Sequence, residues 1–524
     1  MNNIAPKDSK NMDWPLFMLS AGFFLLFVIL CLINNEELAN NLIHAAHGAI
    51  VKYSGAVMQL AFLIIWIVCL LIAFSRFGDV KIGGRTAEVE IKTFNWFAII
   101  LTTLLAGGGI FFSAAEPMYH FVNVPNAFVG IEPSAQEAIG YAMAQSFLHW
   151  GFLAWGVQAI GVMILVYACE YKGQPLKARS MLYPLLGEKG VNGIPGIIMD
   201  ASSLIAVAAG TIGPIGFLSL QMSYALQSLW GVPDVFSTRL IILIAATCIF
   251  TTAASTGIYK GVNFLAKLTV CLAIFIIGVV LLIGPGIFIL DSFVTGMGVY
   301  LSNFFTIALY RGDVEWLGQW TAFFWPWFLS YAPTMAILLI RISKGRTIRQ
   351  LLLAVCLAGP VITNFWFSIL GGTGIYMELN NPGLISTPMM ENGMPTVLLT
   401  IMQNMPLSII LVPLSLLLVT LFLVTNGSSV TYSMSIGVTG MEHPYRWVRI
   451  VWGCVLGLVA TLLIKIGGAG AMDSLQTFIV ITAVPLFIFY LPQIYTSFDC
   501  IRKCYMYEDA AQNRGTAQAE TERP

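Results

Sequence analysis

Long runs of apolar residues, separated by short polar breaks, make up most of this chain. Most of the runs are roughly twenty residues long, the length with which an α-helix crosses a hydrocarbon core of about 30 Å. The pattern therefore predicts an all-α polytopic membrane protein with about twelve transmembrane helices. The predicted spans are Leu16–Ile33, Ala56–Phe74, Phe94–Phe112, Ala138–Tyr167, Ser202–Gln227, Leu240–Ala254, Leu268–Leu290, Leu317–Ile340, Leu351–Leu370, Leu407–Tyr432, Val448–Ile466 and Leu475–Tyr490.

Two further apolar stretches, Val294–Ala308 and Thr396–Met405, are too short to cross a bilayer. We expect both to lie along the membrane interface.

Charged residues alternate in sign from loop to loop. Basic residues follow the even-numbered spans, and they are Arg76, Lys81, Arg85, Lys92, Lys172, Lys177, Arg179, Lys189, Arg341, Lys344, Arg346, Arg349, Arg446 and Arg449. The other loops are acidic and carry Glu36, Glu37, Glu132, Glu137, Asp313, Glu315, Glu378 and Glu391. By the positive-inside rule the basic loops and both termini are cytoplasmic, in a plasma membrane that we take to be a bacterial inner membrane.

The composition agrees with this class. The 524 residues are 58% hydrophobic and 10% charged, whereas a soluble domain carries about 25% charged residues. The net charge of zero argues against a nucleic-acid partner. The nine cysteines lie mostly within apolar runs and show no disulfide framework or metal-ligand spacing. No protease-type zinc motif, acid dyad or phosphate loop is present, so we expect no catalytic residues and no enzyme.

Two spans contain residues that disturb helices. The third contains Ala106, Gly107, Gly108 and Gly109, and the eighth contains Pro326 and Pro333. Each glycine costs a helix about 1 kcal/mol relative to alanine. Interrupted helices at corresponding places in two halves indicate a midplane binding site, so we expect the third span to unwind at 106–109. The alternative is that these small residues let helices pack closely.

Aromatic residues form one stripe on the eighth span. Trp320, Phe324, Trp327, Tyr331 and Met335 follow one another at spacings of four, three, four and four, which puts them on one helix face. The fourth span adds Trp150 and Trp155 near its centre. Converging aromatic faces suit a cation that donates no hydrogen bond, such as a trimethylammonium group. Ordinary packing between helices is the alternative.

Several motifs resemble the betaine/carnitine/choline transporter family. They are Glu116-Pro117 after the glycine-rich third span, Pro184-Leu185-Leu186-Gly187-Glu188-Lys189-Gly190, Tyr300 to Phe305, and Trp320 to Tyr331 followed by Arg341 to Arg349. The resemblance runs from the second span to the twelfth. It implies a LeuT-type inverted repeat of five plus five helices, no cofactor other than a candidate sodium ion, and a homotrimer.

The resemblance also divides the chain. It implies a cytoplasmic N-terminus (1–14), two leading transmembrane helices (15–93), a first five-helix repeat (94–290), an interfacial segment (291–316), a second five-helix repeat (317–498) and a short cytoplasmic tail (499–524).

The site residues that the resemblance implies form an ammonium cage. The cage falls on Tyr119, Trp150, Trp155 and Trp327, with Tyr331 and Trp320 on the same stripe, and it looks most like the carnitine/butyrobetaine branch. Met335 matches that branch too, where a thioether takes a sodium position. Gln158 stands where members carry a tyrosine, and its amide suits a substrate hydroxyl or carboxylate.

The sequence leaves open whether the transporter exchanges substrates or couples substrate uptake to sodium symport. The sodium-independent exchangers of the family carry an arginine where this chain has Thr269. Hydroxyl and carbonyl oxygens for a sodium ion are available at Thr211, Thr269 and Thr425, next to Asn426, together with the backbone of Thr102 and Leu105.

The sequence thus predicts a secondary transporter of a quaternary-ammonium compound such as carnitine, butyrobetaine, betaine or choline. The alternative is sodium- or proton-coupled uptake of a different small zwitterion or a sulfonium compound. An osmosensing regulator or a channel fits least, because the tail is short and the predicted centre is aromatic. His149, inside the fourth span, is interpreted as a packing histidine bonded to a backbone carbonyl, with proton relay as the alternative.

Overall fold

The computed structural model describes residues 12–33, 36–256, 259–441 and 443–521, and the side chains of 36–39, 102–107, 259–264 and 511–521 lie outside this description. All named elements in the described part are helices, and the only bridge between extended segments joins Lys81 and Thr347. The prediction of an all-α chain is confirmed.

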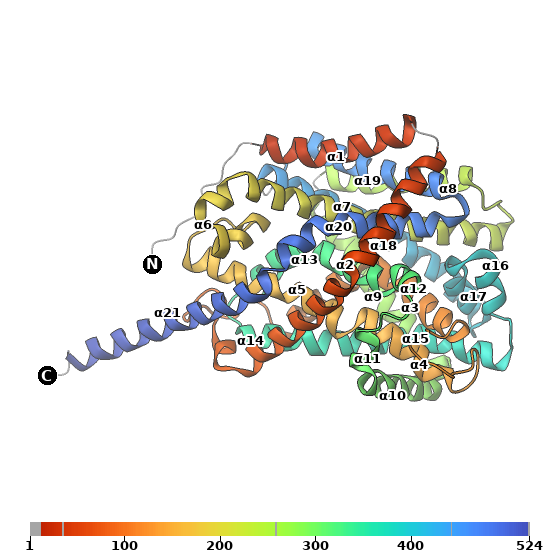
Figure 1. The fold of residues 1–524 in the computed structure, drawn as a ribbon. Coiled ribbons are helices and arrows are strands. Elements are labelled where there is room, and N and C mark those ends of the chain that lie inside the picture. The colour runs from red at the N-terminus through yellow and green to blue at the C-terminus, as the bar shows by residue number, and fades with distance from the viewer. Residues whose placement is uncertain (1–11, 34–35, 257–258, 442, 522–524) are drawn as a thin grey trace.

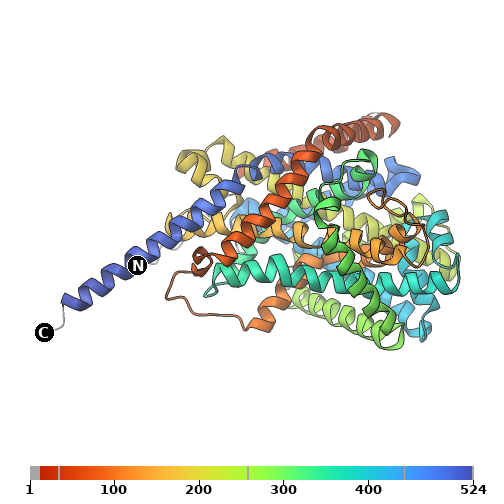
Figure 2. The same cartoon turned by 60° about the horizontal axis from the view of Figure 1, so that its bottom comes forward.

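The helices pack into one bundle, from which α21 projects (Figures 1 and 2). The α-helices are α1 (Trp14–Ile33), α2 (Glu36–Phe74), α3 (Thr93–Val122), α4 (Ala138–Trp150), α5 (Phe152–Leu165), α6 (Tyr183–Asn192), α7 (Ile194–Trp230), α8 (Phe236–Ser255), α9 (Tyr259–Ile283), α10 (Gly286–Ser302), α11 (Phe304–Ala308), α12 (Val314–Gln319), α13 (Thr321–Ile342), α14 (Ile348–Leu353), α15 (Gly359–Asn380), α16 (Ser386–Asn392), α17 (Val397–Asn404), α18 (Ser408–Thr439), α19 (Arg446–Gly467), α20 (Ala471–Tyr490) and α21 (Gln493–Thr521).

The predicted spans are helical over most of their length, although the fourth, seventh, eighth and ninth each extend over more than one helix. Among the residues described, ten stretches are long and apolar enough to cross a membrane. One of them, Arg446–Tyr490, contains both α19 and α20, and α3 occupies the third predicted span. The polytopic membrane architecture follows from these helices.

One boundary was predicted too late. The seventh span ends at Ile283 rather than Leu290, and the interfacial helix α10 begins at Gly286 rather than near Val294. Pro285 separates the two helices, because its ring has no N–H with which to continue the hydrogen-bond ladder of α9.

The helix interruptions also differ from the prediction. Helix α3 continues through Gly108 and Gly109, and α13 continues through both of its prolines, so the expected unwound segment is not observed there. The side chains of Ala106 and Gly107 lie outside the described residues. Breaks occur instead at Gly151, between α4 and α5, and at Trp320, between α12 and α13.

The packing partners of the two five-helix sets correspond. Helix α3 packs on α15 as α13 packs on α5, and α7 packs on α20 as α18 packs on α9. Helices α7 and α18 pack on each other, as do α8 and α19. Exchanging the two sets leaves these pairings unchanged, which is the behaviour of repeats related by a pseudo-two-fold axis. The pattern supports the predicted division at 94–290 and 317–498, which stays a prediction.

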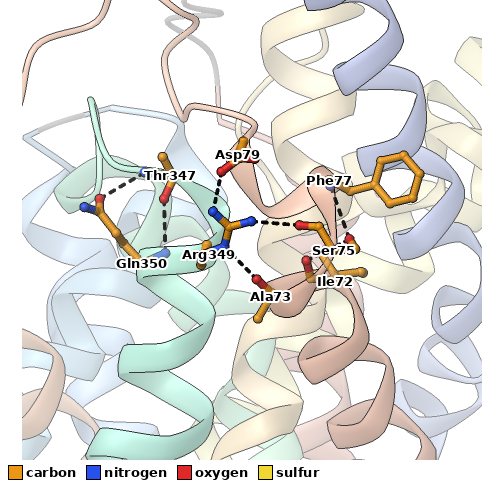
Figure 3. Close-up of polar contacts among 8 residues, drawn as sticks. All are labelled: Ile72, Ala73, Ser75, Phe77, Asp79, Thr347, Arg349 and Gln350. Atoms are coloured by element: carbon orange, nitrogen blue, oxygen red, sulfur yellow. Dashed lines mark hydrogen bonds and ion pairs between the residues drawn. The ribbon is translucent and has the colours of Figure 1, made fainter.

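The basic loops meet on one face of the bundle. Arg349 bonds the carbonyls of Ala73 (2.8 Å) and Ser75 (2.9 Å) at the end of α2 and pairs with Asp79, as Figure 3 shows. The amide of Gly83 donates to Glu170 at 2.9 Å, which brings in the loop after the fourth span.

Residues near both ends of the described chain contact this face as well. Asp13 pairs with Arg179 at 2.8 Å, and Glu508 pairs with Arg85 at 3.2 Å. Loops of the other parity meet elsewhere, with Asn126 donating to Asp313 at 2.8 Å. The predicted grouping of loops onto two faces therefore agrees with the structure, while the cytoplasmic assignment stays a prediction.

Candidate functional site

A free backbone carbonyl on α7 organises the aromatic face of α13. Pro214 has no N–H to donate to the carbonyl of Gly210, four residues earlier in the helix. That oxygen instead accepts from Nε1 of Trp327 and from the hydroxyl of Tyr331, both at 2.8 Å. The proline thus leaves an acceptor in the helix interior, and two residues of the predicted stripe satisfy it.

Trp150 and Trp327 come together, as predicted. Their ring centroids lie 5.8 Å apart with an angle of 80° between the planes. Phe324 and Phe328 of α13 contact the Trp150 ring at 5.4 and 5.5 Å. Phe112 of α3 lies 5.9 Å from Trp327. Edge-to-face contacts of this kind are the favourable arrangement of aromatic rings.

Gly108 makes room for the Trp327 ring. A Cβ atom at Gly108 would lie 2.2 Å from Cη2 of Trp327, far inside the contact distance. The glycine is therefore needed for close approach of two helices, the alternative considered for the glycine triplet, and no unwinding is required to explain it.

Other predicted cage members lie elsewhere. Tyr119 and Trp320 contact each other at 4.7 Å on the far side of Phe324 from the basic loops. The Trp155 ring lies against Gly359 at the start of α15, where a Cβ would approach it to 2.4 Å. Gln158 donates from Nε2 to the carbonyl of Phe328 at 2.6 Å and so connects α5 to α13. The rings of Phe112, Trp150, Phe324, Trp327 and Phe328 are called the ring cluster below.

A cavity of about 600 Å³ begins at Tyr331 and opens toward the basic loops. Its inner lining includes Tyr331, Thr334 and Met335 of α13, and its outer lining includes Lys177 and Arg341. This volume falls within the usual range for small-molecule sites. The cavity lies beside the ring cluster, whose members Trp150 and Trp327 are themselves buried.

Three of the predicted coupling residues line the same cavity: Thr269, Thr425 and Asn426. The hydroxyls of Thr269 and Thr425 donate to the carbonyls of Leu265 (2.8 Å) and Leu421 (2.7 Å), which leaves their lone pairs free to face a cation. The Nδ2 atom of Asn426 has no hydrogen-bond partner among the described residues.

The remaining coupling residues contribute less. Thr211 donates to the carbonyl of Val207 at 2.8 Å and lies 3.2 Å from the Tyr331 hydroxyl, behind the cavity wall. The backbone of Thr102 and Leu105, which the prediction used, belongs to helix α3, and the side chains of both residues lie outside the description. The oxygen set around Thr269 and Thr425 suits sodium chemically, since hard cations prefer hydroxyl and carbonyl oxygens.

The Gly210–Pro214 arrangement was not identified from the sequence. The signal was present, because a proline inside a span always frees the carbonyl four residues before it. The partner of such a carbonyl depends on how distant helices pack.

Comparison with known proteins shows the family of the chain. A model of the betaine/carnitine/choline family of transporters matches residues 15–505. Glycine betaine transporter 2 of Vibrio parahaemolyticus is 47% identical, over 92% of this chain and 88% of that protein. The ectoine/hydroxyectoine transporter of Virgibacillus pantothenticus is 30% identical over 92% and 95%, respectively. The ectoine/glycine betaine/proline transporter EctP of Corynebacterium glutamicum is 28% identical over 95% and 81%.

These matches extend over nearly all the helices described above, including those that carry the ring cluster and the cavity. The chain therefore belongs to the betaine/carnitine/choline family, whose members are membrane transporters and not enzymes.

Proposed function

We propose that this protein carries a small trimethylammonium zwitterion of the glycine betaine type across the membrane by alternating access. The observation that supports the proposal is the perpendicular pair of Trp150 and Trp327 rings. Trp327 shares the carbonyl of Gly210 with Tyr331, which lies at the inner end of the cavity. An ammonium group that donates no hydrogen bond is held by the faces of such rings.

The names of the relatives favour glycine betaine over carnitine as the substrate. The most similar relatives reported above are named for glycine betaine, ectoine, hydroxyectoine and proline. The likeness to the carnitine branch is based on the set Tyr119, Trp150, Trp155 and Trp327 and on Met335. Of that set, Tyr119 and Trp155 are not in ring contact with Trp327 among the contacts of the described residues.

The arrangement of open and closed parts supports alternating access. The cavity reaches Arg341 on the face of the basic loops, while Trp320 and Tyr119 pack against each other beyond the ring cluster. With the basic loops in the cytoplasm, this conformation is open to the inside.

Sodium is the coupling ion in this proposal. Thr269, Thr425 and Asn426 face the cavity, and Thr269 takes the position of the arginine that substitutes for sodium in the exchangers that the family includes. Bound sodium would supply charge that favours the substrate carboxylate. Thr269 and Thr425 would offer it their hydroxyl oxygens.

Substrate exchange is the second candidate, and one residue favours it. Met335 lines the cavity one turn from Tyr331, and a thioether is a poor ligand for sodium. Exchange needs no coupling ion if the protein changes sides only with substrate bound, because one substrate molecule then leaves for each one that enters.

Uptake into proteoliposomes separates these possibilities. Radiolabelled glycine betaine, carnitine, butyrobetaine, choline and ectoine are each supplied with a sodium gradient, with a proton gradient, or with unlabelled substrate inside. We expect glycine betaine to accumulate with the sodium gradient alone, and Thr425→Val to raise the sodium concentration for half-maximal uptake. Uptake that needs only internal substrate would establish exchange, and failure of every trimethylammonium compound would refute the proposed substrate class.

Assembly and location are proposed on family likeness. We expect a homotrimer in a bacterial inner membrane with both termini in the cytoplasm. Native mass spectrometry of the purified protein and reporter fusions at each terminus test these two expectations.

A further inference from the structure

Three ionisable side chains are buried together beside the ring cluster. Glu116 and His120 lie one turn apart on α3, and His149 lies on α4; all three are fully buried. One carboxylate oxygen of Glu116 is 2.5 Å from Nδ1 of His149 and 3.5 Å from Nε2 of His120. A proton therefore lies between Glu116 and His149.

A carboxylate at this depth is costly. Ionisable groups inside a membrane protein are retained where they serve a function, because desolvation of their charge is unfavourable. Within the described residues, Glu116 has ion-pair contacts with the two histidines and none with a lysine or arginine. Packing alone would be served better by an apolar residue.

The second oxygen of Glu116 holds a residue of the cage. It accepts a hydrogen bond from Nε1 of Trp150 at 2.8 Å. The ring centroid of the same Trp150 indole lies 5.8 Å from that of Trp327. The orientation of Trp150 therefore depends on the position of the Glu116 carboxylate.

His149 fixes that carboxylate and connects it to α13. Its Nε2 atom lies 2.9 Å from the hydroxyl of Thr321, the first residue of α13, and 2.9 Å from the amide of Gln145. The network thus joins α3, α4 and α13, the helices that contribute Phe112, Trp150 and Trp327 to the ring cluster. This pattern is that of outer residues that orient the groups contacting a ligand.

We propose that Glu116 is a positioning residue of the substrate site: its carboxylate, held by His149, keeps the Trp150 indole in the orientation that faces Trp327. The proposal relies on the proposed function for the identity of the ligand. It assigns no contact between Glu116 and the substrate.

A double-mutant cycle tests the assignment. The full-length protein is purified as wild type, Glu116→Leu, Trp150→Phe and the double variant, and the Kd for glycine betaine is measured by calorimetry together with Tm. Trp150→Phe keeps a ring but lacks the N–H. We expect each single change to raise Kd about tenfold, the scale of one hydrogen bond to a charged group, and the double variant to be no weaker than Trp150→Phe.

Two further variants separate positioning from stability. Glu116→Gln retains an oxygen for Trp150 and is expected to bind within about threefold of wild type. Glu378→Gln is the matched control, because Glu378 is a buried carboxylate that accepts from the amides of Gly383 (2.7 Å), Ile385 (2.8 Å) and Ser386 (3.0 Å), away from the cage. It should lower Tm without changing Kd.

If the Kd increases of the two single variants multiply in the double variant, the proposal is overturned. An unchanged Kd in folded Glu116→Leu would overturn it as well. If Glu116→Leu does not fold, Thr321→Val takes its place, since it removes one contact of His149 and leaves no unpaired charge. Its effect on Kd must then vanish in the Trp150→Phe background.

A ligand-free readout distinguishes failure of this proposal from failure of the proposed function. The indole ¹⁵N resonance of Trp150, assigned by its loss in Trp150→Phe, should shift in Glu116→Leu because that variant removes the acceptor of the indole N–H. If wild type binds no betaine but this shift is present, the substrate assignment fails and the positioning contact stands. An unshifted resonance would contradict the positioning contact itself.

Discussion

The two ends of α13 differ in their surroundings: one is closely packed and the other lines a cavity. At its N-terminal end, Phe324 and Trp327 pack with Trp150 and Phe112 at centroid distances of 4.9 to 5.9 Å. Toward its C-terminal end, Tyr331, Thr334 and Met335 line a cavity of about 600 Å³. The same helix therefore has a closely packed half, called here the sealed half, and a half that lines the cavity, called here the open half.

The difference shows where a ligand is expected. Trp327 belongs to the sealed half and Tyr331 to the open half, and the two side chains share the carbonyl of Gly210. In the proposed function, an ammonium group that enters through the cavity would reach aromatic faces at this junction. Closing the cavity around it would complete the cage, as alternating access requires.

The largest expected effect comes from removing the ring at the junction. Trp327→Ala should raise the Kd for glycine betaine at least about 30-fold, since one good contact between a cation and an aromatic face contributes about 2 kcal/mol. Calorimetry on purified protein measures it. Trp325→Phe is the control, because Trp325 stacks on Phe62 of α2 at 5.4 Å and not on the cage rings. If Trp327→Ala and Trp325→Phe weaken binding equally, the two faces of α13 that carry these residues do not differ in their contribution to binding.

A smaller effect is expected from crowding the sealed half. Gly108→Ala places a methyl group where the Trp327 ring lies and should raise Kd about tenfold, within the usual cost of overpacking. The same binding assay is used. Gly278→Ala in α9 provides the comparison, since a Cβ there meets nothing within 4 Å, and it should bind as wild type. Wild-type binding by Gly108→Ala would mean that the observed approach of α3 to Trp327 is not part of the bound state.

The smallest effect concerns access to the open half. Thr334→Cys should react with a water-soluble thiol reagent applied from the side of the basic loops, and glycine betaine should slow the reaction about threefold by favouring closed states. Mass spectrometry of the labelled peptide gives the rate. Ser330→Cys, at a fully buried position one turn earlier, should stay unlabelled. Labelling of Thr334→Cys from the opposite side alone would reverse the assigned orientation.

The helical spans could be predicted from the sequence because a membrane imposes a fixed length on apolar runs. The ring stripe could be predicted as well, since Trp327 and Tyr331 share one helix face by spacing alone. The positions of the helix breaks could not be predicted. A glycine triplet predicts a helix break, yet Gly108 is helical and makes room for the Trp327 ring. A break occurs instead at the single glycine Gly151.

Long-range polar contacts were the other part that the sequence did not show. His149 was interpreted as bonded to a backbone carbonyl, and its partners are instead Glu116 at 2.5 Å and Thr321 at 2.9 Å. These residues lie 33 and 172 positions away along the chain, so only the packing of α3, α4 and α13 brings them together. The placement of Tyr119 with Trp320, away from Trp327, depends on the same packing.

The most direct test compares glycine betaine with 3,3-dimethylbutanoate, in which carbon replaces the charged nitrogen and the shape is retained. Both are titrated against the purified wild-type protein by calorimetry. Because the rings of Trp150 and Trp327 attract the positive charge rather than the methyl groups alone, we predict that the carbon analogue binds at least about 30-fold more weakly. Equal affinity for the two compounds would contradict the ammonium cage and with it the proposed transport of a trimethylammonium zwitterion.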